Sequence, residues 1–238
     1  MGRWARAAAG LAAALGTVAT SARASDLEGT VKVSSPPAAV LAHVTIDRHV
    51  CGQTGLVFES TVSVSREGLL DGAVAYLEPK APAVSLPPRA KPDRSKPEPA
   101  VIDQKNCAFV PTVQVLLRGT AVRLRNSDPV FHNVHVFDEH GVSVTNVSMP
   151  LIGQEVQAFT ADRPGRYSVR CDAGHRWMHA ELLVLDHPYF AAVRRGSYRI
   201  PAVPPGSYWL VIFHPVLGER RTLIDVGSED RIVRSVEF

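Results

Sequence analysis

The chain has 238 residues, of which 45% are hydrophobic, and it carries 26 basic residues against 23 acidic ones. The leader predicted below holds three arginines and no acid, so the charges that remain are balanced. This balance removes the usual signal for a nucleic-acid partner or an anionic membrane surface, and neither is expected.

Residues 1–24 have the pattern of a secretory signal peptide. Arg3 and Arg6 form a basic start, residues 7–18 are an apolar run too short to span a bilayer comfortably, and Ala-Arg-Ala precedes the predicted cut after Ala24. We therefore expect an exported protein, periplasmic or secreted. No other long apolar segment follows, so stable membrane insertion is not expected.

The region 25–78 is predicted to be a β region, and 79–100 a proline-rich linker. Residues 61–64 alternate as a half-buried strand does, and residues 73–77 follow the turn signal Asp71-Gly72. The linker mixes prolines with charged residues, has little to bury and cannot donate steadily to a sheet.

Many short strands are predicted from residue 101 onward. Residues 121–125 alternate cleanly, and turn signals separate the runs at regular intervals, which is typical of a β-sandwich over 101–186. Residues 187–238 are predicted to form a smaller β-meander. The predicted fold class is all-β, a β-sandwich with an additional small sandwich or meander. Whether residues 25–78 pack with the sandwich over 101–186 or with the meander over 187–238 stays open.

Four side chains point to a metal centre. Cys171, His175 and Met178 lie on one short loop, and His132 lies about forty residues upstream. A thiolate, two imidazoles and a weak axial thioether are the ligands of a mononuclear copper site that alternates between Cu(II) and Cu(I). Gly174 would let the backbone wrap closely around an ion.

Two neighbouring histidines compete with these ligands. His132 shares one face of its predicted strand with Val134 and Val136, whereas His135 lies on the other face, which favours His132 as ligand and His135 as a surface histidine near the site. His179 follows Met178 directly and could replace it as the axial ligand. The remaining histidines are expected not to bind metal.

The three cysteines fit an oxidising compartment. Cys51 and Cys107 can form a disulfide, which leaves Cys171 as the odd thiol that a metal would protect. Such a link closes a loop of roughly 55 residues and would contribute about 4 kcal/mol in the chain-entropy model. The alternative is that Cys51 is a free buried thiol.

The motifs around these ligands resemble those of the cupredoxin family. Phe131-His132-Asn133-Val134 followed by Phe137-Asp138-Glu139 is similar to the first-ligand strand of plastocyanin, and the Cys-His-Met loop resembles the second half of that motif. Residues 101–218 resemble the cupredoxin-like proteins labelled "methylamine utilization protein". The stretches that carry this likeness include Asp103-Gln104-Lys105-Asn106-Cys107, Arg125-Asn126-Ser127-Asp128-Pro129, Trp177-Met178 and Asp186-His187-Pro188-Tyr189-Phe190.

The resemblance implies a Greek-key sandwich in which Asn133 braces the Cys171 loop. It also implies a periplasmic redox enzyme or a cytochrome as partner. The chain departs from the family pattern by placing three residues, rather than two, between Cys171 and His175. The turn Pro204-Pro205-Gly206 with Tyr208 resembles the carboxypeptidase regulatory-like β-sandwich, a module that usually packs or binds.

The predicted function is that of a type 1-like copper protein that carries single electrons in the periplasm. With all four positions filled by protein, no position is open for a substrate, so the protein is not expected to be an enzyme. One alternative is a copper-binding or delivery protein without redox duty, which the longer Cys-to-His spacing leaves room for. Another is a metal-free interaction module.

Overall fold

The structure is a computed structural model that describes residues 23–80, 86 and 98–238. The predicted leader, apart from its last two residues, and most of the predicted linker lie outside the described residues. Among the residues described, no helix is both long and apolar enough to cross a membrane. The part of the chain that is described is almost entirely β, with α1 (Arg48–Cys51) as its one α-helix.

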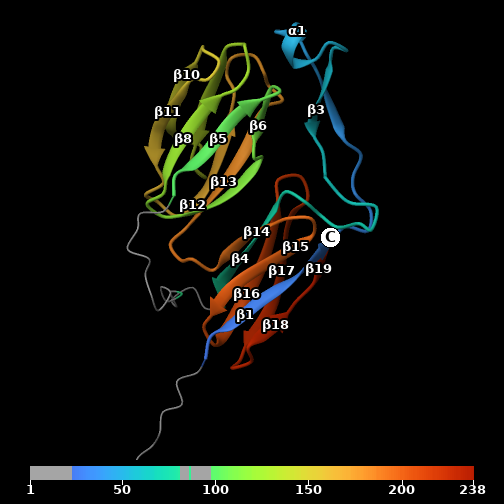
Figure 1. Cartoon of the computed structure of the whole chain (residues 1–238), viewed down its shortest axis with the longest axis vertical. Helices are drawn as coiled ribbons and strands as arrows, with labels where there is room; N and C mark the ends of the chain where they lie inside the picture. The colour runs from blue at the N-terminus through green and yellow to red at the C-terminus, as the bar shows by residue number, and fades with distance from the viewer. Residues whose placement is uncertain (1–22, 81–85, 87–97) are drawn as a thin grey trace, which may run out of the picture.

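Residues from 100 to 185 form a first sandwich of two sheets (Figure 1). The five-stranded sheet has the order β10-β9-β12-β13-β7 and the four-stranded sheet the order β11-β8-β5-β6. Their strands are β5 (Ala100–Lys105), β6 (Ala108–Val110), β7 (Val113–Leu117), β8 (Ala121–Asn126), β9 (His132–Phe137), β10 (Ser143–Met149), β11 (Glu155–Thr160), β12 (Gly165–Arg170) and β13 (His179–Leu185).

Alternation along the strands builds the core of this sandwich. On β8, Val122 and Leu124 are fully buried, whereas Arg123 and Arg125 face solvent and both pair with Glu155 on β11. The inward residues of the two sheets form one apolar cluster. The predicted all-β sandwich is therefore present in this region.

A second sandwich combines the C-terminal strands with two strands from the N-terminal region (Figure 1). One sheet has the order β14-β4-β16-β17 and the other the order β15-β1-β18, with β19 also paired to β1. Their strands are β1 (Ser25–Lys32), β4 (Ala73–Pro79), β14 (Phe190–Val193), β15 (Ser197–Val203), β16 (Gly206–His214), β17 (Gly218–Val226), β18 (Arg231–Val233) and β19 (Val236–Glu237). The strand expected over 61–64 does not form; Val64 makes only an isolated bridge to Leu70.

Between β1 and β4 the chain leaves the second sandwich and returns. Residues 40–60, called here the 40–60 hairpin, contain β2 (Val40–His43), α1 and β3 (Leu56–Ser60), and they lie beside the first sandwich (Figure 1). Val44 and Cys51 belong to the core of the first sandwich, and Cys51 is bonded to Cys107 there. The predicted disulfide is thus confirmed, and Cys171 is the free cysteine.

The two sandwiches meet through an apolar contact. Val74 and Tyr76 on β4 and Val211 and Phe213 on β16 cluster with residues of β7 and β13 from the first sandwich. The Arg166 guanidinium lies 4.1 Å from the centre of the Phe213 ring. Burial of these side chains fixes one sandwich against the other.

Candidate metal centre

Three adjacent strands of the five-stranded sheet deliver the candidate ligands to one end of the first sandwich. His132 is the first residue of β9, Cys171 directly follows β12, and His175 and Met178 lie on the loop that leads into β13. Because β9, β12 and β13 are neighbours, their ends bring residues some forty positions apart into contact.

The donor atoms of three predicted ligands converge. His132 Nδ1 lies 3.3 Å from His175 Nδ1, and Cys171 Sγ lies 3.7 Å from the same nitrogen. All three atoms fall within 4.8 Å of one another, which is a spacing that one metal ion can bridge. Both imidazoles are fully buried and Cys171 is 5% exposed.

The predicted axial residue is buried as well. Met178 is 1% exposed, its backbone N–H donates to His175 O at 2.9 Å, and it lines a surface concavity together with Cys171. The competing His179 is exposed. His135 is not part of this converging group; its Nδ1 is 2.5 Å from Asp172 Oδ2 and its Nε2 is 2.8 Å from Ser143 Oγ.

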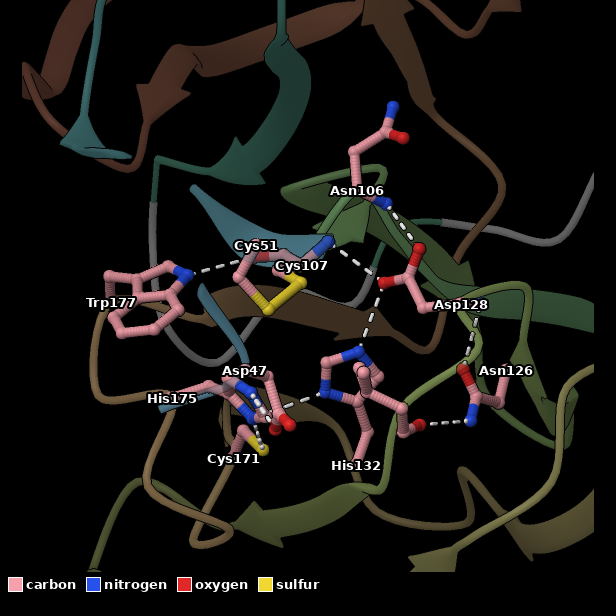
Figure 2. Close-up of a disulfide and its surroundings, with 11 residues drawn as sticks. Asp47, Cys51, Asn106, Cys107, Asn126, Asp128, His132, Cys171, His175 and Trp177 are labelled. Atoms are coloured by element: carbon pink, nitrogen blue, oxygen red, sulfur yellow. Dashed lines mark hydrogen bonds and ion pairs between the residues drawn. A yellow bond between two sulfur atoms is a disulfide. The ribbon is translucent and has the colours of Figure 1, made fainter. Parts of the chain in front are cut away.

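The outer nitrogen of each imidazole is held by a carboxylate. His132 Nε2 lies 2.9 Å from Asp128 Oδ2, and His175 Nε2 lies 3.1 Å from Asp47 Oδ2 (Figure 2). A histidine that donates its Nε2–H to a carboxylate keeps the lone pair of Nδ1 free for a metal. The two carboxylates thereby turn both Nδ1 atoms toward Cys171 Sγ.

Asp128 is itself fixed by the backbone around it. It accepts the N–H of Asn106 at 2.7 Å and the N–H of Cys107 at 2.8 Å, and its own N–H donates to Asn126 Oδ1 at 3.0 Å. Asn126 also donates to two carbonyls, those of Val130 and Met149. This network is buried and saturated, so it holds the turn before His132 in one conformation.

The buried groups favour a thiolate beside a cation when no metal is bound. Burial raises the pKa of Cys171, but hydrogen bonds from His132 and His175 outweigh it and lower the pKa to about 6. Burial likewise opposes charge on His132, yet its bonds to Asp128 and Cys171 raise its pKa to about 9. The thiolate is the form of cysteine that binds metal.

The donor set suits copper. Two imidazole nitrogens and one thiolate form a compact buried group, and they are the donors of the trigonal site that proteins use for copper; the buried Met178 would supply the weak axial thioether of such a site. A second metal-capable group among the described residues consists of Cys107, Asp128 and His132. It shares His132 with the first, and its cysteine is consumed by the disulfide.

Comparisons with known proteins place cupredoxins among the structural neighbours. A mutant of amicyanin has a TM-score of 0.33 and 21% identity, over 37% of this chain and 82% of that one. A purple cupredoxin from Nitrosopumilus maritimus has a TM-score of 0.31 and 22% identity, over 36% of this chain and 99% of that one. A copper-containing nitrite reductase from Thermus scotoductus SA-01 has a TM-score of 0.31 and 23% identity, over 37% of this chain and 22% of that one. No family model and no curated protein matches the chain.

The brace implied by the plastocyanin resemblance is present. Asn133 Oδ1 accepts the backbone N–H of Asp172 at 3.1 Å, so β9 holds the residue that follows Cys171. Trp177 is buried as well; its Nε1–H donates to Cys107 O at 2.9 Å and its ring meets the His175 ring edge-on at 5.3 Å. The indole therefore packs against the His175 ring.

Sequence reasoning missed the two carboxylates. Asp128 carried a local signal, since it stands four residues before His132 in the turn that positions it. Asp47 carried none, because it comes from the 40–60 hairpin, 128 residues away from His175 along the chain. Only folding brings that hairpin to the ligand loop.

Proposed function

We propose that the protein binds one copper ion through His132, Cys171 and His175, with Met178 as axial ligand, and carries single electrons between redox partners. The observation that supports this most directly is the convergence of three buried donor atoms within 4.8 Å. Copper held by such ligands supplies one-electron chemistry by alternating between Cu(II) and Cu(I).

The surroundings of the donors favour a carrier. Asp128 and Asp47 fix the two imidazoles, and Asn133 fixes the start of the loop after Cys171. Ligands that are already in place need little rearrangement when the charge of a bound ion changes. Because the protein would fill all four positions, we propose that it is not an enzyme. A periplasmic redox enzyme or a cytochrome is the proposed class of partner.

The test is the visible absorption and electron paramagnetic resonance of the protein loaded with Cu(II), measured beside Cys171→Ala and His132→Gln. The wild type should show an intense thiolate-to-copper band and bind one equivalent of copper. Cys171→Ala should lose the band, and His132→Gln should lose affinity. His140→Gln, at a histidine whose side chain is 78% exposed, is the matched control and should change neither.

Two outcomes would count against the carrier. Unchanged copper content in Cys171→Ala, with no such band in the wild type, would remove the thiolate from the site. A colourless protein that holds only Cu(I) and passes it to an acceptor would instead support copper delivery. A reversible reduction potential supports the carrier.

A further inference from the structure

We propose that Asp47 is a positioning residue for His175, and that the 40–60 hairpin, fastened by the Cys51–Cys107 disulfide, is a clamp that closes the copper centre from outside the first sandwich. This inference rests on the proposed function, because it concerns the same ligands. It adds a part of the chain that the ligand motifs do not include.

The hairpin depends on its contacts with the first sandwich. In the described part of the chain, β2 and β3 pair only with each other, so no ladder of backbone hydrogen bonds attaches them to a larger sheet. Val44 and Cys51 are buried in the core of the first sandwich, and Val50 and Val57 pack against it. The disulfide is the one covalent link at this contact.

The disulfide joins two cysteines whose backbone N–H groups each donate to an aspartate that holds an imidazole (Figure 2). On one side, Cys51 N–H donates to Asp47 O at 2.9 Å, which ties Asp47 to α1. On the other side, Cys107 N–H donates to Asp128 Oδ2 at 2.8 Å. The disulfide therefore connects Asp128, which holds His132, with Asp47, which holds His175.

The hairpin also closes the outer edge of His175. The imidazole is fully buried, although its loop lies at the end of the sandwich, and its Nε2 contacts Asp47, whose side chain is 30% exposed. Gly174, next to His175, approaches Ile46 so closely that an added Cβ would lie 2.8 Å from Ile46 Cδ1. Without the hairpin, this edge of the centre would face water.

Asp47 adopts a backbone conformation that makes clean substitutions possible. Its φ of 47° and ψ of 35° lie in the left-handed region, which Asn and Gly occupy without the strain that Ala would suffer. Asp47→Gly thus removes the carboxylate, and Asp47→Asn removes the charge while it keeps an oxygen acceptor. Glu59→Gln, an exposed carboxylate on β3 of the same hairpin, is the matched control.

The first measurement is made on Cu(II)-loaded protein. Loss of the carboxylate behind a metal-binding histidine typically weakens metal affinity about 10–100-fold. We expect a loss in this range for Asp47→Gly, with altered copper hyperfine splitting and a raised reduction potential, because a negative charge that favours Cu(II) is gone. Asp47→Asn should fall between Asp47→Gly and the wild type, and Glu59→Gln should match the wild type.

The second measurement is made on metal-free protein and tests the clamp without copper. Cys171 is the only thiol outside the disulfide, so its alkylation rate reports how often the centre opens. The rate should rise several-fold in Cys51→Ser/Cys107→Ser, in which the hairpin is no longer fastened. Circular dichroism checks that this variant is folded.

The two proposals fail in different ways. Wild-type affinity, hyperfine splitting and potential in Asp47→Gly, in a protein that does show the thiolate-to-copper band, would overturn the positioning role alone. An unchanged alkylation rate in the folded double variant would overturn the clamp. A wild-type protein without the band would overturn the proposed function.

Discussion

The two sandwiches are built from the same kind of strand but bury different side chains. The first sandwich encloses seven polar side chains, namely Gln104, Thr120, Asn126, Asp128, His132, Asn133 and His175. The core of the second consists of aliphatic and tyrosine side chains. Outside the first sandwich, the buried polar residues in the described part of the chain are Ser25, His187 and His214. Because burying polar groups costs free energy unless they are paired, such a concentration marks a site rather than a scaffold.

Two buried histidines, one in each sandwich, illustrate this difference in surroundings. His132, in the first sandwich, faces the acceptors Asp128 and Cys171, which raise its pKa to about 9 despite burial. His214, in the second, accepts the backbone N–H groups of Val216 and Leu217 at its Nδ1, and burial lowers its pKa to about 4. Partners, not burial alone, decide the charge of a histidine.

The largest expected effect is the separation of these two pKa values in metal-free protein. Imidazole signals followed by NMR should show His132 protonated until the pH rises through about 9, and His214 neutral until the pH falls to about 4. His132→Gln and His214→Gln assign the signals. If both residues titrated near the ordinary 6.5, the contrast between the sandwiches would be wrong.

The same shifts predict opposite effects on stability. The contribution of His132 is full below pH 6.5 and is lost as the pH rises through about 9, because its folded pKa is raised. His214 must stay neutral in the folded state, so stability is full above pH 6.5 and falls as the pH drops toward about 4. Unfolding in denaturant at several pH values measures both contributions.

A matched pair of core substitutions should distinguish residues that only stabilise the fold from residues that also shape the metal centre. Leu210 in the second sandwich and Leu124 in the first are both fully buried, and Leu→Ala at either should lower the free energy of unfolding by about 2–5 kcal/mol. Leu124 lies two residues before Asn126, so only Leu124→Ala should also change the Cu(II) spectrum. An equal spectral change in Leu210→Ala would show that the second sandwich shapes the centre.

The smallest expected effect concerns the ion pair between the sandwiches. Arg166 Nη2 lies 3.3 Å from Glu219 Oε2, and both side chains are more than a third exposed. A double-mutant cycle with Arg166→Gln and Glu219→Gln should give a coupling of about 0.2–1 kcal/mol that decreases with salt. A markedly larger coupling would mean that charge, rather than the apolar contact of Val74, Val211 and Phe213, holds the sandwiches together.

Local patterns were enough to predict the all-β class, the ligands to be tested and the disulfide. Period-two alternation on residues 121–125 became β8, because successive side chains of any strand point to opposite faces of the sheet. Likewise, counting three cysteines leaves one thiol over once a disulfide forms, and Cys171 is that thiol. The predicted domain boundaries and the periplasmic location remain predictions.

Partners distant in the sequence required the tertiary structure. The sequence left open whether β1 and β4 join the C-terminal strands, and the structure pairs β1 with β15 and β4 with β16. Sheet pairing depends on the whole core and not on any one strand. For the same reason Asp47 had no signal: its carboxylate meets His175 only after the 40–60 hairpin folds onto the first sandwich. The residues alone supply the donor atoms, whereas folding brings up the carboxylates that orient these atoms and the hairpin that covers them.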